Sequence, residues 1–191
     1  PPGWVEILDE FVPAYSKLPE SYRECLIDKV KIMVAELTFE GCNGVFVDDP
    51  MKVAIAGQAA MLLLGTRNYY FETVSTILVF PDVIERQITD QQSGRPIHGH
   101  TEFRSGEAYQ TGQIVLSWPD VLQGGSRQDG RNLVIHEFAH HLDSLDGEMG
   151  GYIPFDNSED AREWEAISSR EYEALVAAKN SRRPVLLDYY G

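Results

Sequence analysis

The stretch His136-Glu137-Phe138-Ala139-His140 decides both the fold and the chemistry of this chain. At about 100° per residue, positions four apart on a helix return to within about 40° of each other. Both imidazoles therefore leave the same helix face, one turn apart, where they can share an ion. The spacing predicts a zinc-binding helix with His136 and His140 as ligands.

Glu137 leaves the same helix about 100° from His136, which places it beside the ion rather than on it. From there a carboxylate can take a proton from an attacking water molecule and pass it to a leaving amine. His-Glu-x-x-His is the pattern of zinc peptidases, so the predicted reaction is the hydrolysis of a peptide bond.

An apolar stripe predicts how this helix is held. It recurs at steps of four, four and three residues and comprises Val134, Phe138, Leu142 and Leu145. One face of a helix over about 131–145 would pack on a core, while the histidine face turns to a cleft. Asp146-Gly147 is expected to end the helix.

The rest of the chain reads as further helices and short strands. Apolar residues at three- and four-residue steps predict helices over 4–11, 19–37, 51–64 and 158–179. Extended runs bounded by turn residues predict strands over 45–47, 73–80 and 113–118, the last closed by Pro119 and the Gly124-Gly125 pair. A long surface loop is expected over 91–112. The chain has no internal repeat, so we expect one α+β domain over 1–191, mostly helical with a small mixed sheet.

Composition narrows the classes of function. The 16 basic and 30 acidic residues give a net charge of −14, which disfavours nucleic acids and anionic membranes as partners. The most apolar run, 59–64, is far shorter than the roughly 20 residues that span a bilayer. Without a secretory signal, Cys25 and Cys42 are expected to be reduced core thiols and the location cytoplasmic.

Three other histidines are weaker ligand candidates. His141 leaves the helix about 100° from His140, so we expect it to be solvated or to support the ligands from behind. His98 and His100 flank Gly99 in the long loop, and two residues at that spacing can chelate. Because no third ligand is near in sequence, they are expected to be exposed loop residues.

Several motifs together resemble the Mlc titration factor A family of bacterial zinc peptidases, related in catalytic core to the anthrax lethal factor group. They run in the family's order and are Ala56-x-Gln58-Ala59-x-x-Leu62-Leu63-x-Gly65, Val79-Phe80-Pro81-Asp82, Gly112-x-Ile114-Val115-Leu116-Ser117-Trp118, 136–143 and Leu187-Asp188-Tyr189-Tyr190-Gly191. The resemblance implies a zincin-like cytosolic peptidase. It also implies binding to the glucose-responsive repressor Mlc, as in the best-known relatives.

Carried over by motif, the resemblance implies that His136 and His140 bind Zn²⁺ and that Glu137 is the catalytic carboxylate. It implies that the phenol of Tyr190 hydrogen-bonds the oxyanion of the tetrahedral intermediate. Tyr189 is the alternative residue for this role.

The third zinc ligand of the family is a glutamate about seven residues past the motif tyrosine, and this sequence ends at Gly191. We therefore expect the chain to be truncated before its ligand-bearing helix, and to hold metal weakly. The alternative is a substitute carboxylate within the chain, for which the candidates are Asp146, Asp143, Glu163 and Glu159.

Two other classes of function stay open. One is a catalytically weak scaffold that sequesters a sugar-uptake repressor; it would keep repressor binding in a His136→Ala variant and cleave no peptide. The other is a zinc hydrolase that turns over esters or amides without peptide selectivity. Aminopeptidase and endopeptidase action are not distinguished by these residues.

Overall fold

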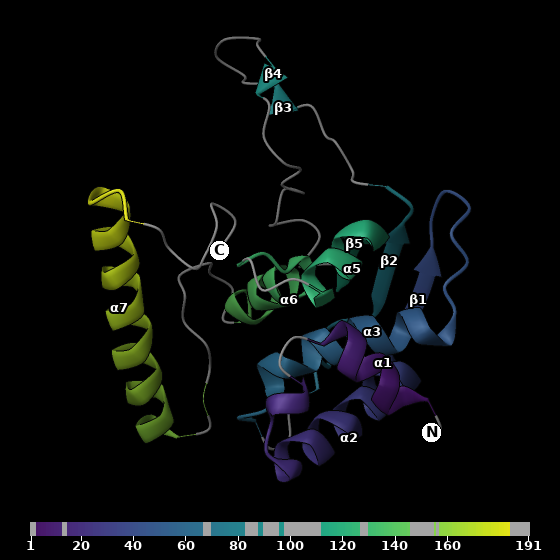
Figure 1. Ribbon diagram of the computed structural model, residues 1–191, viewed down its shortest axis with the longest axis horizontal. Coiled ribbons are helices and arrows are strands. Elements are labelled where there is room, and N and C mark those ends of the chain that lie inside the picture. The colour runs from purple at the N-terminus through teal and green to yellow at the C-terminus, as the bar shows by residue number, and fades with distance from the viewer. Residues whose placement is uncertain are drawn as a thin grey trace.

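The computed structural model describes residues 3–12, 15–66, 70–82, 112–126, 130–145, 155 and 157–183, and the backbone of 88–89 and 96–97. In these ranges the chain forms helices and short strands (Figure 1). The helices are α1 (Trp4–Phe11), η1 (Tyr15–Lys17), α2 (Glu20–Glu36), α3 (Asp49–Ala60), η2 (Met61–Leu63), α5 (Trp118–Ser126), α6 (Leu133–Asp143) and α7 (Ser158–Asn180). The strands are β1 (Thr38–Gly41), β2 (Thr76–Phe80), β3 (Ile88–Thr89), β4 (Pro96–Ile97) and β5 (Gln113–Ser117). The expected α+β class is confirmed.

Three strands form a sheet in the order β1-β2-β5, and both pairings are parallel. Its register pairs Leu78 of β2 with Glu40 on one side and Val115 on the other. Helices α3 and η2 carry the chain from the end of β1 to the start of β2, the crossover that a parallel pair needs. The antiparallel strands β3 and β4 form a separate pair. The expectation of one mixed sheet was therefore wrong in the described residues.

The first strand lies earlier in the sequence than expected. A strand was predicted over 45–47, but Phe46 is 84% exposed and β1 occupies Thr38–Gly41 instead. After β1 the chain turns through Asn43 and Gly44, both at positive φ, and the Val45 N–H donates to the Cys42 carbonyl. Strand β1 has no apolar run because its side chains alternate between exposed and half-buried. The residue types of β1 therefore do not indicate that its backbone pairs with β2.

Helix α3 is the centre of the core. The Asp48 carboxylate accepts a hydrogen bond from the Met51 N–H at 2.9 Å, and Pro50 lies in the first turn, where no N–H is needed. Every residue from 53 to 60 is buried, which confirms the expectation of a helix covered on most sides. Gly57 lets α1 approach closely, since a Cβ there would overlap the side chains of Leu8 and Val12.

A second difference is helix α5, where a turn had been expected. The Asp120 N–H donates to the Ser117 hydroxyl at 3.2 Å, and that hydroxyl donates to the Asp120 carboxylate. This Ser-x-x-Asp pattern, with Pro119 in the first turn, is a helix-start signal that sequence reasoning missed. Gly124 and Gly125 lie inside the helix and are buried, so the pair permits close packing and does not break the helix.

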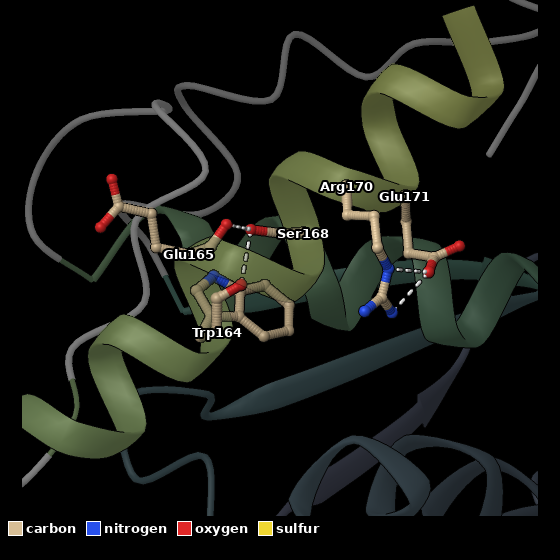
Figure 2. Close-up of polar contacts among 5 residues, drawn as sticks. All are labelled: Trp164, Glu165, Ser168, Arg170 and Glu171. Atoms are coloured by element: carbon tan, nitrogen blue, oxygen red, sulfur yellow. Dashed lines mark hydrogen bonds and ion pairs between the residues drawn. The ribbon is translucent and has the colours of Figure 1, made fainter. Parts of the chain in front are cut away.

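The last helix, α7, confirms the prediction over 158–179, but its apolar side chains are not buried. Trp164, Ile167 and Tyr172 remain exposed, and Figure 1 shows α7 apart from the other helices. The polar contacts drawn in Figure 2 are local to α7: the Ser168 hydroxyl donates to the Trp164 carbonyl at 2.8 Å, and Arg170 pairs with its neighbour Glu171.

Two further expectations concern the described part of the chain. Cys25 and Cys42 are unpaired, as predicted, although both are half-buried rather than in the core. Among the described helices, none has the length and apolarity needed to cross a bilayer.

Candidate metal centre

Helix α6 carries the candidate metal ligands and packs against α3, α5, η2 and β5. Asn132 caps its N-terminus: the side-chain oxygen accepts a hydrogen bond from the Ile135 N–H at 2.8 Å. The predicted apolar stripe is confirmed: Val134, Phe138 and Leu142 are buried, and Leu145 packs against the core. This buried face fixes the helix, while His136, Glu137 and His140 are only partly buried.

The imidazoles of His136 and His140 converge. Their Nε2 atoms are 3.0 Å apart, the ring centroids are 4.4 Å apart and the ring planes are at 88°. Two nitrogens that bind one tetrahedral zinc ion at ordinary distances lie about 3.3 Å apart. The observed separation thus needs a change of only a few tenths of an ångström, so the pair fits a shared divalent ion.

No described residue completes this site. The structure gathers no group of three or more His, Cys, Asp or Glu side chains able to hold a metal, counted over the described residues. Asp143, Glu159 and Glu163 are among these residues, so they do not form a three-ligand group with the pair. Asp146, the fourth in-chain candidate, lies outside the described residues, as do Tyr190 and Tyr189.

His141 is buried, with 2% of its surface exposed, which excludes the solvated alternative. Its Nε2 lies 2.7 Å from the Thr73 hydroxyl, and its ring contacts the buried Phe71 ring, which packs edge-on against Phe138. Burial lowers the pKa of His141 below its ordinary value, so the ring is neutral at pH 7. His141 thus connects the helix to the segment before β2. His98 and His100 lie outside the described residues.

Two features near the site were not predicted from the sequence. The buried Gln58 of α3 is hydrogen-bonded to Asn132, and α5 lies between β5 and α6. The Ser117-x-x-Asp120 pattern would have revealed α5. Only the fold brings Gln58 to Asn132, because 74 positions separate them.

Comparison with known proteins assigns the chain to a family. The family model described as glucose-regulated metallo-peptidase M90 matches residues 1–191. The chain belongs to the M90 family. Membership of this metallopeptidase family implies a metal ion, which agrees with the convergent histidine pair on α6.

Individual relatives confirm the resemblance seen in the sequence. Mlc titration factor A of Escherichia coli is 26% identical over 164 residues, which cover 85% of this chain and 60% of that protein. The factor of the same name from Yersinia enterocolitica is 25% identical over 162 residues, with the same two shares. An uncharacterized protein of Synechocystis sp., slr2042, is 34% identical over 194 residues, covering all of this chain and 70% of that protein. This M90 chain therefore spans about 60% of the length of the Mlc titration factors.

Proposed function

We propose that this chain carries the core of a zinc peptidase in which His136 and His140 hold the ion and Glu137 is the general base. The observation that supports the proposal most is the 3.0 Å approach of the two Nε2 atoms on a helix that is otherwise held by a buried face. Membership of the M90 family supports the same chemistry.

Zinc held by this pair would supply Lewis acidity, polarising the scissile carbonyl and lowering the pKa of water toward about 7. Glu137 is adjacent in sequence to His136 and partly buried. Its carboxylate takes the proton of the attacking water and delivers it to the leaving nitrogen. In the proposed scheme the phenol of Tyr190 donates a hydrogen bond to the oxyanion, an assignment that rests on the family motif alone.

Strand β5 is the proposed docking edge for the peptide. Among the described residues it pairs with β2 on one side and with no strand on the other, and it contacts α6. An edge strand presents unpaired N–H and C=O groups to which an extended peptide can add as a further strand. The substrate backbone would then run past the histidine pair in a fixed direction. The third zinc ligand is proposed to come from outside the described residues.

The test is Glu137→Gln in the full-length protein. The amide keeps the size of the side chain but cannot accept the proton. We expect bound zinc, measured by elemental analysis, to stay at the wild-type level and peptide cleavage to fall at least 100-fold. Glu36→Gln, at the exposed end of α2, is the control and should cleave normally. Unchanged cleavage by Glu137→Gln would remove Glu137 from the mechanism.

A second proposed role is binding of a repressor that controls sugar uptake. Its support is that two of the relatives named above are Mlc titration factors that match 85% of this chain. His136→Ala separates the two roles, because it removes one proposed zinc ligand and leaves the rest of the surface intact. Two results together would favour the regulatory role: the His136→Ala variant still binds the repressor, and the wild-type protein cleaves no peptide. A cytoplasmic location remains a prediction.

A further inference from the structure

A fully buried amide lies in α3, the helix at the centre of the core. Gln58 of α3 is 0% exposed, and both polar ends of its side chain are hydrogen-bonded. Its Nε2 donates to the Val121 carbonyl of α5 at 3.1 Å, and its Oε1 accepts from Asn132 Nδ2 at 2.9 Å. A buried amide is costly unless it is paired. Its pairing here joins the central helix to both α5 and the start of α6.

Asn132 makes hydrogen bonds that no other capping residue can reproduce. Its Oδ1 accepts from the Ile135 N–H at 2.8 Å, while Nδ2 donates to Gln58 Oε1 and also to the Gly124 carbonyl at 3.1 Å. Serine, threonine and aspartate can accept the capping bond, but none of them offers two further N–H donors from the same group. The residue type is therefore explained by its links to α3 and α5 as well as by the cap.

Asn132 also fixes the backbone of His136, the first of the two proposed metal ligands. The His136 N–H donates a hydrogen bond to the Asn132 backbone carbonyl at 3.0 Å, within the first turn of α6. Whatever fixes Asn132 therefore fixes the backbone of His136 one turn later. The side chain of Asn132 is attached to α3 and α5, and α5 follows directly after β5, the proposed docking edge.

The glycines of α5 make this arrangement possible. A Cβ at Gly124 would lie 3.0 Å from Asn132 Cα, and one at Gly125 would lie 3.0 Å from Gln58 Nε2 and overlap the Phe11 carbonyl. A side chain at either position would require α5 or the residues that it contacts to shift. The Gly-Gly pair therefore serves the approach of α5 to the amide pair.

We propose that Gln58 and Asn132 are positioning residues for the metal helix, α6, which carries His136 and His140. Their hydrogen bonds fix α6 against α3 and α5, and so set the distance between the histidine pair and strand β5. The expected effect on turnover rests on the proposed peptidase function. The attachment of α6 to α3 and α5 by these hydrogen bonds does not. Since a misplacement of about 1 Å can lower a rate about 100-fold, loss of the link should reduce turnover although neither residue touches the reacting atoms.

The test uses Gln58→Met, Asn132→Ser and their double variant in the full-length protein. Met removes both amide links at nearly the same volume, whereas Ser keeps the helix cap and removes the two donors. Asn132→Ser therefore keeps the test open if Gln58→Met does not fold. Asn157→Ser is the matched control, because Asn157 caps α7 and its hydrogen bonds with described residues all go to Glu159 and Asp160 of that helix.

Three measurements are made: kcat and KM on one peptide, the absorption spectrum of the Co²⁺-substituted protein, and hydrogen exchange of the α6 amides. We expect each single variant to lower kcat about 10- to 100-fold with little change in KM and to alter the Co²⁺ spectrum. The double variant should be worse than either single but by less than the sum of the two effects, since both substitutions remove the same Gln58–Asn132 hydrogen bond. Asn157→Ser should match the wild type.

Normal kcat and an unchanged Co²⁺ spectrum in both single variants would overturn the positioning role. If the wild-type protein binds no metal and cleaves nothing, the proposed function fails, and hydrogen exchange decides the inference by itself. Faster exchange of the Ile135 and His136 amides in Gln58→Met and Asn132→Ser, but not in Asn157→Ser, supports the positioning role. Unchanged exchange of these amides in Gln58→Met and Asn132→Ser overturns that role.

Discussion

The Thr73 hydroxyl and Nε2 of His141 lie 2.7 Å apart, and this contact joins the segment before β2 to the second half of α6. Thr73 is exposed and His141 is buried, so the bond closes one side of the core next to His140. Asn132 and Gln58 hold the first turn of the same helix. The metal helix is thus attached near both of its ends by side-chain hydrogen bonds.

Thr73→Val should lower the free energy of unfolding by about 1 kcal/mol, because it removes the hydroxyl while keeping the shape and leaves His141 Nε2 without this partner. The cost is at the low end of the range, since Thr73 is exposed and water can reach the site. Urea unfolding measures it. Thr38→Val, on the exposed face of β1, is the control and should change stability by less than about 0.5 kcal/mol. Equal effects of the two substitutions would contradict a specific role for the bond.

Gly125→Ala should destabilise the protein by about 1–3 kcal/mol, because the added methyl overlaps the Phe11 backbone carbonyl, which cannot rotate away. Gly65→Ala is the matched control. A Cβ at Gly65 meets nothing within 4 Å and its φ is not positive, so alanine there should be neutral or should stabilise by about 0.4–1 kcal/mol. Thermal unfolding of the two variants measures both effects. A stable Gly125→Ala protein would mean that α5 does not pack as closely as described.

Lys29→Met should raise stability at pH 7 by about 1 kcal/mol, because the variant no longer has to bury an ammonium group. Lys29 is 2% exposed; its Nζ donates to the Thr66 hydroxyl at 3.3 Å and lies 4.7 Å from the centre of the Tyr70 ring. Thr66 keeps a partner in the variant, since its hydroxyl also donates to the Leu63 carbonyl. Chemical unfolding at pH 7 gives the difference.

The same residue predicts a dependence on pH. Burial lowers the pKa of Lys29, with a smaller opposing effect from Cys25, so the folded state releases the proton at a lower pH than the unfolded state. Between the lowered pKa and about 10.4 the unfolded chain binds more protons, and the free energy of unfolding rises with pH. Lys29→Met should lose this increment, while Lys31→Met, at an exposed position on the same helix, should keep it. Parallel profiles for all three proteins would show that Lys29 does not contribute.

Local patterns predicted most of the helices. The apolar stripe through Val134, Phe138 and Leu142 predicted α6, because a helix with one buried face has apolar residues that recur about every 3.6 positions. The wrong predictions were short elements without such a pattern. Strand β1 alternates polar and half-buried residues, and α5 contains two glycines that normally mark a turn.

The sequence by itself determined that two imidazoles share one helix face beside a carboxylate, since that geometry follows from the four-residue spacing of His136 and His140. The tertiary structure decided what holds that helix. His141 meets Thr73 across 68 positions, and Gln58 meets Val121 and Asn132 across 63 and 74. Hydrogen bonds over such separations form only when packing brings their elements together, and no local period records them. Spacing therefore located the chemistry, while contacts distant in the chain fixed its position.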